Sequence, residues 1–519
     1  MLFSICGLLT FICGACIFLI FSYSINFSIL TLNGSHWDPL LFLDFVGVSI
    51  LLMLFVCFSY ALFYTGHYFG HDYAGVELNK IICLFVSVMA SLVLTGDFLS
   101  TLVFWEYLGV VSFFLILFYS NYLSLRSSVI TLVSSRYGDV CLFLIIALSI
   151  FNNYPIIILA MVFFFIVFTK SASFPFTSWL LEAMRAPTPV SSLVHSSTLV
   201  AAGVWFSMRY DMFNYMENSS LFLSVLLLTI FITGICCFFF LDLKKIVALS
   251  TCNNIAWCIV YLLCGNVLLS LFQLVSHGVS KCLLFMLVGD VMSGTGGSQA
   301  SNCVYTPPLY GNWGLFGLFC VILGLSGAPF IGVFFTKHFL LSTLNSSTNV
   351  ILITSIMCCV FLSYFYSFRL CRILANLNSG VATGVLYAFS SGIMVYAWLF
   401  VNYSTAASLD ETTSVSFNFS SCLLIFQLFS CLTAYFLYNS TFFRSWSSYI
   451  FGCDNLVESC YNMFNLLNRT VSLFFYRWDN QMLLLFNNNN NNFVNIYSYG
   501  ILNIIMLSTI FFLTCWFIL

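Results

Sequence analysis

The sequence contains very little charge for its length. Only 6% of its 519 residues are Asp, Glu, Lys or Arg, whereas a soluble domain carries roughly 25%. The formal net charge is −2, and the sequence has neither a cluster of Lys and Arg nor a long polar segment. These absences argue against nucleic-acid binding and against a sizeable soluble enzyme domain.

Proline is also scarce, with 8 residues, whereas hydrophobic residues make up 61% of the chain. Apolar runs of about 20 residues recur from end to end, and each can cross a bilayer core of roughly 30 Å. Helices satisfy their own backbone hydrogen bonds in lipid. The sequence therefore predicts an all-α, multi-pass membrane protein. Residues 1–25 lack a basic flank and a small-residue cleavage site, so we expect a first span there rather than a cleaved signal.

Hydropathy predicts about fifteen spans in two series. The expected spans are 3–23, 40–64, 80–97, 98–119, 127–150, 155–184, 190–209, 221–241, 246–264, 266–291, 313–345, 348–372, 381–401, 418–438 and 497–518. The expected organisation is N-terminal spans in 1–79, two halves in 80–241 and 242–401, an additional span in 402–441, a lateral amphipathic segment in 442–496 and an anchor span in 497–519.

Two of the expected spans are long and interrupted. Each combines a lysine with a proline: Lys170 and Pro175 in 155–184, and Pro329 and Lys337 in 313–345. Proline removes a backbone donor and disrupts the preceding turn. Paired interrupted spans in two halves of a chain usually mark a transporter site. The tripeptide Phe-Thr-Lys also occurs at both places, which favours two related bundles over chance repetition in a Phe-rich sequence.

Ionisable residues within the spans are the main site candidates. A charge at the centre of a membrane helix costs about 2.5 to 3.5 kcal/mol on insertion scales, so it persists only if it is paired, hydrated or functional. The candidates are Glu106, Arg136, Asp139, Lys170, His195, Lys281, Lys337 and His338. Arg136 and Asp139 lie three residues apart on one helical face, where they either neutralise each other or take part in function.

Gln273, His277 and Lys281 recur every four residues and form one polar stripe on a long apolar helix. Desolvation favours the neutral form of a lysine, whereas a nearby carboxylate favours the charged form. Histidine titrates near neutral pH and can pass protons between lysines. The alternative is a set of structural ion pairs and capped polar groups. For the lysines we favour a proton path, and for the single buried His195 the two interpretations are closer.

Metal and cofactor chemistry find little support in the sequence. His67 and His71 lie four residues apart beside Asp72, a spacing that a metal could use, but no third or fourth ligand is evident. We therefore expect no cofactor and no metal in this chain.

Several segments resemble the antiporter-like membrane subunits of respiratory complex I. They are FPFTSWL at 174–180, APTPVSSLVH at 186–195, AAGV at 201–204, DLKKIVALST at 242–251 and the stretch from His277 to Lys281. The resemblance extends over roughly residues 40–345. It implies a fourteen-helix core with two inverted five-helix repeats, each with a broken helix, followed by a lateral helix and a final span.

The resemblance also implies a proton path. In such subunits the residues that match Glu106 and Lys170 connect through His195 and one of Lys244 and Lys245 to Lys281 and Lys337, driven by quinone reduction elsewhere in the complex. His338 stands where the family usually has an acidic residue, and Gln273 where it has a histidine.

The resemblance further implies partners and a location. FMN, iron–sulfur clusters and ubiquinone are expected in partner subunits. Other membrane-arm subunits, above all the neighbouring antiporter-like one, and lipids including cardiolipin are the expected neighbours. The mitochondrial inner membrane and a mitochondrial gene are the expected location and origin. The alternatives are the large subunit of a multi-subunit Na⁺/H⁺ antiporter and a subunit that mainly clamps the membrane arm together.

Overall fold

The structure is a computed structural model that divides the chain into two units, Met1–Gly452 and Cys453–Leu519, and each is described by itself. The residues that it describes are 23–26, 30–32, 35–37, 39–70, 72–150, 156–210, 219–294, 297–301, 303–306, 311–328, 333–344, 350–375, 378–379, 417–438, 453–487 and 503–511.

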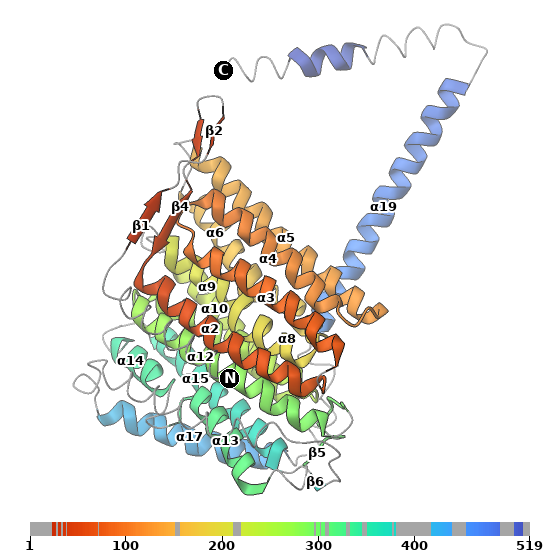
Figure 1. Ribbon diagram of the computed structural model, residues 1–519. Coiled ribbons are helices and arrows are strands. Elements are labelled where there is room, and N and C mark those ends of the chain that lie inside the picture. The colour runs from red at the N-terminus through yellow and green to blue at the C-terminus, as the bar shows by residue number, and fades with distance from the viewer. Residues whose placement is uncertain are drawn as a thin grey trace. The chain divides into compact units, whose positions relative to one another are not determined.

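The first unit is a bundle of helices that run alongside one another (Figure 1). Its helices are α2 (Phe45–Tyr68), α3 (Tyr73–Leu94), α4 (Phe98–Leu117), α5 (Tyr122–Ile150), α6 (Ile156–Ser171), α7 (Ser178–Ala183), α8 (Thr188–Leu193), η1 (Val194–Thr198), α9 (Leu199–Tyr210), α10 (Ser220–Phe239), α11 (Leu243–Leu263), α12 (Val267–Ser293), α13 (Gly311–Ser326), α14 (Phe334–Leu344), α15 (Val350–Ala375) and α17 (Phe417–Tyr438).

The predicted membrane fold is confirmed for the described part of the chain. Ten of its helices are long and apolar enough to cross a membrane, and two shorter apolar helices, Ile158–Ser171 and Phe316–Ser326, belong to the interrupted spans. The expected span 381–401 lies outside the described residues, as does 3–23 apart from Tyr23, which belongs to a strand. Of the expected span 497–518, residues 503–511 are described, and they are helical.

Short antiparallel strands correct the prediction at the start of the bundle. They are β1 (Tyr23–Asn26), which pairs with β4 (Leu40–Leu43), and β2 (Leu30–Leu32), which pairs with β3 (Ser35–Trp37). A parallel pair, β5 (Tyr305–Thr306) and β6 (Asn378–Ser379), lies farther along the chain. The expectation that a span begins at residue 40 is therefore wrong. Helix α2 begins at Phe45 because the Asp44 side chain accepts the Gly47 N–H and caps it.

Helix α3 begins at Tyr73 and not at residue 80 as expected. Its first two turns carry an ion pair between Glu77 and Lys80 with an N–O distance of 2.7 Å. The apolar stretch alone therefore underestimates the length of the helix, because ion pairs three residues apart stabilise a helical turn without burying apolar surface.

The most enclosed helices lie in the middle of the unit. The stretch Thr188–Tyr210, which contains α8, η1 and α9, is buried throughout its apolar window, and α11 and α12 are 94% and 89% buried in theirs. Helices α2, α8 and α13 pack against α12, and α10 packs against α11. Most polar side chains on these central helices are therefore enclosed by neighbouring helices.

Both interruptions that the sequence predicts are present. Helix α6 ends at Ser171 and α7 begins at Ser178, whereas α13 ends at Ser326 and α14 begins at Phe334. Trp179 Nε1 donates to Thr169 O at 2.9 Å, which ties α7 to the last turn of α6. Pro329, the proline of the second expected break, lies outside the described residues.

An ion pair holds one end of the bundle together. Arg209 at the end of α9 pairs with Asp44 (Nη1–Oδ2, 2.9 Å) and donates to Phe42 O and Val93 O. Its side chain is only 5% exposed. We expect Arg209→Met to destabilise the fold by about 3 kcal/mol, because removing one partner of a buried pair leaves the other charge uncompensated. Thermal unfolding of the purified assembly measures this.

The exposed pair of Glu77 and Lys80 provides the control for that measurement. Lys80→Met is expected to change stability by less than about 0.5 kcal/mol, because exposed pairs contribute little. Equal effects of the two substitutions would contradict the assignment of Arg209 as a structural residue.

The second unit contains α19 (Cys453–Asn487), a helix of 35 residues. At 1.5 Å per residue it is roughly 50 Å long. It is strongly amphipathic, and large apolar side chains such as Phe464, Leu467, Phe474 and Trp478 are exposed within the unit. The expected lateral amphipathic segment at 442–496 therefore contains one continuous helix.

Candidate functional site

Three charged residues gather where α4 packs on α5. Arg136 Nη1 lies 3.4 Å from Glu106 Oε1 and 3.6 Å from Asp139 Oδ2. The Asp139 side chain is 4% exposed, whereas those of Glu106 and Arg136 are 35% and 47% exposed. Arg136 thus bridges two carboxylates, one enclosed and one at the surface of the unit.

Lys170 lies in the last turn of α6, next to this cluster. Its side chain is buried, and its Nζ lies 5.1 Å from the centre of the Trp105 ring. Burial acts on its charge most strongly, and the charges of Asp139, Arg136 and Glu106 follow in that order. Gly138 allows this proximity, since a Cβ there would clash with Thr169 Oγ1. The lysine that precedes the first break is thus closest in its electrostatics to Asp139, not to Glu106.

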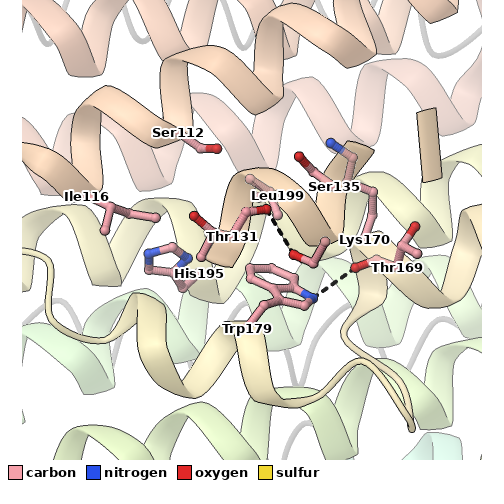
Figure 2. A pocket seen from close by; sticks show the side chains of 10 residues that line it. Ser112, Ile116, Thr131, Ser135, Thr169, Lys170, Trp179, His195 and Leu199 are labelled. Carbon is pink, nitrogen blue, oxygen red and sulfur yellow. Dashed lines mark hydrogen bonds between the residues drawn. The ribbon is translucent and has the colours of Figure 1, made fainter. Parts of the chain in front are cut away.

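A cavity lies between Lys170 and His195 (Figure 2). Figure 2 shows the two side chains at opposite sides of it, with Thr131 and Trp179 between them. The cavity offers about 10 Å³ to the centre of a water molecule, roughly what one ordered water requires. Its other polar walls are hydroxyl groups, those of Ser112, Ser134, Ser135 and Thr169.

Neither Lys170 Nζ nor the two ring nitrogens of His195 has a hydrogen-bond partner among the described residues. Buried polar groups are rarely left in this state. The hydroxyl-lined cavity between them supplies the room and the polar partners that a bridging water needs. The cavity therefore places room for water and hydroxyl partners between a buried lysine and a buried histidine.

His195 lies on η1, a single π-helical turn between α8 and α9. Such turns widen a helix locally and are frequent at functional sites. Trp179 packs edge-on against the imidazole at 6.4 Å between ring centres. The charge of Lys244 acts on His195 from α11, so His195 lies between two buried lysines.

The structure distinguishes Lys244 from Lys245. Lys244 is 4% exposed and donates from Nζ to Ala186 O at 3.3 Å. Lys245 points the other way, is about a third exposed and pairs with Asp242 at 3.5 Å. Only Lys244 faces the interior of the bundle.

Lys281 lies on α12, where its Nζ donates to the Ser250 hydroxyl and to Val247 O at 3.4 Å, both on α11. No carboxylate forms an ion pair with it in the described part of the chain. One turn earlier, both ring nitrogens of His277 have no hydrogen-bond partner among described residues. The charge of Lys281 acts on His277.

Gln273 lies at the next turn of the polar stripe (Gln273, His277, Lys281). Its Oε1 accepts from Thr336 Oγ1 at 2.8 Å. Thr336 belongs to α14, so this bond joins the polar stripe to the second broken helix. The whole stripe is buried, as its periodicity predicts.

Lys337 follows Thr336 and is held at the break. Its Nζ donates to Ser326 O at 2.6 Å and to Ser363 Oγ at 2.5 Å, and it lies 4.7 Å from the centre of the Tyr364 ring. Ser326 is the last residue of α13, so Lys337 bridges the two arms of the broken helix. His338 is 5% exposed and packs against Phe334.

His67 does not form a metal site in the described structure. It pairs with Asp290 at the end of α12, with Nε2–Oδ1 at 3.1 Å. His71 lies outside the described residues, and no three His, Cys, Asp or Glu side chains among the residues described could hold a metal ion. The pair instead connects the ends of α2 and α12.

The site contains polar groups that the sequence reasoning did not single out. They are the hydroxyl groups of the cavity, Trp105, Trp179, Ser250, Thr336 and Ser363. Ser250 lies about one helical turn after Val247, and Lys281 contacts both residues on the same face of α11. Thr169 and Thr336 belong to the two Phe-Thr-Lys tripeptides, whereas the other hydroxyl groups carry no signal of their own in a chain rich in Ser and Thr.

Comparisons with known proteins place the chain in one family. Residues 95–365 match the family model described as NADH:quinone oxidoreductase/Mrp antiporter, TM. NADH-ubiquinone oxidoreductase chain 5 of Aedes aegypti is 31% identical over 431 residues, which cover 78% of this chain and 68% of the relative. The protein of the same name from Caenorhabditis elegans is 37% identical over 358 residues, 64% of this chain and 66% of the relative.

Solved structures show the same fold at lower identity. A chain of the Mrp complex from a Dietzia species matches with a TM-score of 0.70 and 18% identity over 96% of this chain, which spans 59% of that chain's length. A chain of an archaeal membrane-bound sulfane sulfur reductase matches with a TM-score of 0.60 and 16% identity, covering 76% of this chain and 84% of its own. At these identities the similarity concerns the fold.

Proposed function

The chain belongs to the family of NADH-ubiquinone oxidoreductase chain 5, and from this premise we propose that it moves protons across the membrane as a membrane-arm subunit of that enzyme. The observation that carries the proposal is the row of buried cations and histidines through the centre of the bundle: Lys170, His195, Lys244, His277, Lys281 and Lys337. Buried ionisable groups without lipid contact are functional by default.

The row is suited to proton transfer and not to redox chemistry. Lysine and histidine bind and release single protons, and the hydroxyl groups beside Lys170, Lys281 and Lys337 can donate and accept hydrogen bonds. FMN, iron–sulfur clusters and ubiquinone belong to partner subunits in this proposal. Their chemistry would change the charge next to one end of the row, and each lysine would respond by binding or releasing a proton.

The membrane setting of the proposal is the mitochondrial inner membrane, with a mitochondrial gene. Arg209 lies at one end of the bundle, whereas six of the described Lys and Arg residues near helix ends lie at the other: Lys80, Arg126, Arg185, Lys245, Arg369 and Arg372. Cytoplasmic or matrix loops carry the excess of positive charge, so this end faces the matrix. The amphipathic helix α19 would lie along neighbouring subunits or lipid, cardiolipin included.

The adjacent pair Lys244 and Lys245 tests the proposal. We expect Lys244→Met to reduce proton pumping about tenfold or more, because a buried proton carrier is lost from the interior of the bundle, and general acid–base groups contribute at least about a hundredfold. Lys245→Met, the matched control one residue away, is expected to leave pumping near normal. Both are measured as protons pumped per NADH in sealed vesicles, at equal complex content on a native gel.

Equal pumping by the Lys244 and Lys245 variants would contradict a path through the interior of the bundle.

The second candidate function is a Na⁺/H⁺ antiporter subunit, favoured by the fold similarity to the Mrp complex over 96% of the chain. The same native gel separates the two. Migration in a small assembly without NADH dehydrogenase activity would support the antiporter, and migration with a large active band would support the oxidoreductase.

A further inference from the structure

The link between the polar stripe and the second broken helix passes through a side chain that cannot titrate. Gln273 has an amide, which neither takes up nor releases a proton near neutral pH. It lies between His277, one turn away on α12, and Lys337 on α14. A path from Lys281 to Lys337 must therefore cross or go around this amide.

Thr336 contacts Gln273 at this point. Its Oγ1 lies 2.8 Å from Gln273 Oε1 and 2.9 Å from Val333 O. A hydroxyl group has one proton to donate, so Thr336 can donate to only one of these acceptors at a time. Val333 O also accepts Lys337 N–H at 3.3 Å, so the carbonyl keeps a partner when Thr336 donates to Gln273.

A third group completes the arrangement. Tyr261 OH, on α11, lies 3.5 Å from Thr336 Oγ1 and can donate to it. Tyr261, Thr336 and Gln273 are all fully buried. Gln273 Nε2 has no hydrogen-bond partner among the described residues, so the amide is fixed through its oxygen alone. One hydroxyl on α14 thus links α11, α12 and the broken helix.

We propose that Thr336 is a positioning residue of the second half of the path. Its hydroxyl holds the Gln273 amide by the oxygen, which turns the N–H₂ group along the stripe, and it connects that amide to the backbone turn that carries Lys337. The two acceptors of the single Thr336 proton give two arrangements of this link, one toward Gln273 and one toward Val333. This inference rests on the proposed function, because it assumes that protons travel between Lys281 and Lys337.

Thr336→Val tests the inference, since valine keeps the shape and removes the hydroxyl. We expect protons pumped per NADH to fall about threefold to tenfold, in the range of one lost hydrogen bond. Thr336→Ser keeps the hydroxyl and is expected to restore pumping to within about twofold of the unaltered chain. The matched control is Thr229→Val on α10, where the hydroxyl donates to Leu226 O of its own helix; pumping is expected to stay normal.

A second substitution covers the case in which Thr336→Val fails to assemble. Gln273→Met conserves volume and removes the acceptor, so it is expected to give the same loss. The double variant is expected to be no worse than either single one, because both remove the same link. A variant with a histidine, Gln273→His in the Thr336→Val background, is expected to recover pumping, since a titratable ring no longer needs the hydroxyl.

Normal pumping by Gln273→Met, or by assembled Thr336→Val, would overturn the inference. The Lys281→Met variant separates this failure from a failure of the proposed function. If Lys281→Met loses pumping while the Thr336 and Gln273 variants do not, the path exists but bypasses Thr336. If Lys281→Met also pumps normally, the proposed function itself is wrong.

Discussion

Lys281→Met is expected to reduce proton pumping and coupled NADH oxidation at least about tenfold, with the complex still assembled. Methionine is close to lysine in length and fills the same space, but it carries no proton. Lys281 is held by the Ser250 hydroxyl and Val247 O and has no ion-pair partner among the described residues. Its loss therefore leaves no unpaired carboxylate, so folding should suffer little while transfer stops.

Lys281→Arg distinguishes a lost charge from a lost proton carrier. Arginine keeps the positive charge but does not release its proton in proteins. We expect this variant to be as inactive as Lys281→Met. Both are measured as NADH oxidation and proton uptake in the same sealed vesicles. Normal pumping by Lys281→Arg would show that Lys281 supplies only a fixed charge.

The parts of the site that involve intramembrane charge were predictable from the sequence. Lys170 and Lys337 stood out because a charge in lipid is costly, and both lie beside helix interruptions that the structure contains. The polar stripe of Gln273, His277 and Lys281 followed from helical periodicity alone, and all three side chains are buried. Strong local signals of this kind do not depend on which helices are neighbours.

The choice of partners could not be predicted, because it depends on packing between distant segments. Lys244 and Lys245 are adjacent and chemically identical, and only the placement of α11 against Ala186 turns one of them inward. The cavity hydroxyls come from α4, α5 and α6, and their spacing in the sequence does not indicate that they line one cavity. The strand β4 was missed because its apolar residues continue the hydrophobic run of α2.

The same reason explains why Asp139 was underestimated beside Glu106. The resemblance pairs the positions of Glu106 and Lys170, whereas the structure makes Asp139 the carboxylate that acts most strongly on Lys170. From the sequence, Asp139 and Arg136 either neutralise each other or take part in function. Arg136 in fact also contacts Glu106, so its charge is shared between two carboxylates and Asp139 remains available to Lys170.

Asp139→Asn is therefore expected to lower proton pumping more than Glu106→Gln does. The Asp139 side chain is 4% exposed and that of Glu106 is 35% exposed, and buried charges are screened much less than exposed ones. We expect a loss of about tenfold for Asp139→Asn and of less than about threefold for Glu106→Gln. Protons pumped per NADH, at matched complex content, is the measurement for both.

The double variant Asp139→Asn with Arg136→Gln tests whether the loss comes from Lys170 or from Arg136. If Asp139 mainly neutralises Arg136, removing both charges together should restore pumping, because no cation is left without its carboxylate and Glu106, which also loses Arg136, is 35% exposed. If Asp139 mainly keeps Lys170 able to hold a proton, pumping should stay low, because Lys170 still lacks its carboxylate. We expect the second result, since Glu106 lies 3.4 Å from Arg136 and can balance it without Asp139. A larger loss in Glu106→Gln than in Asp139→Asn would instead return the role of proton partner to Glu106.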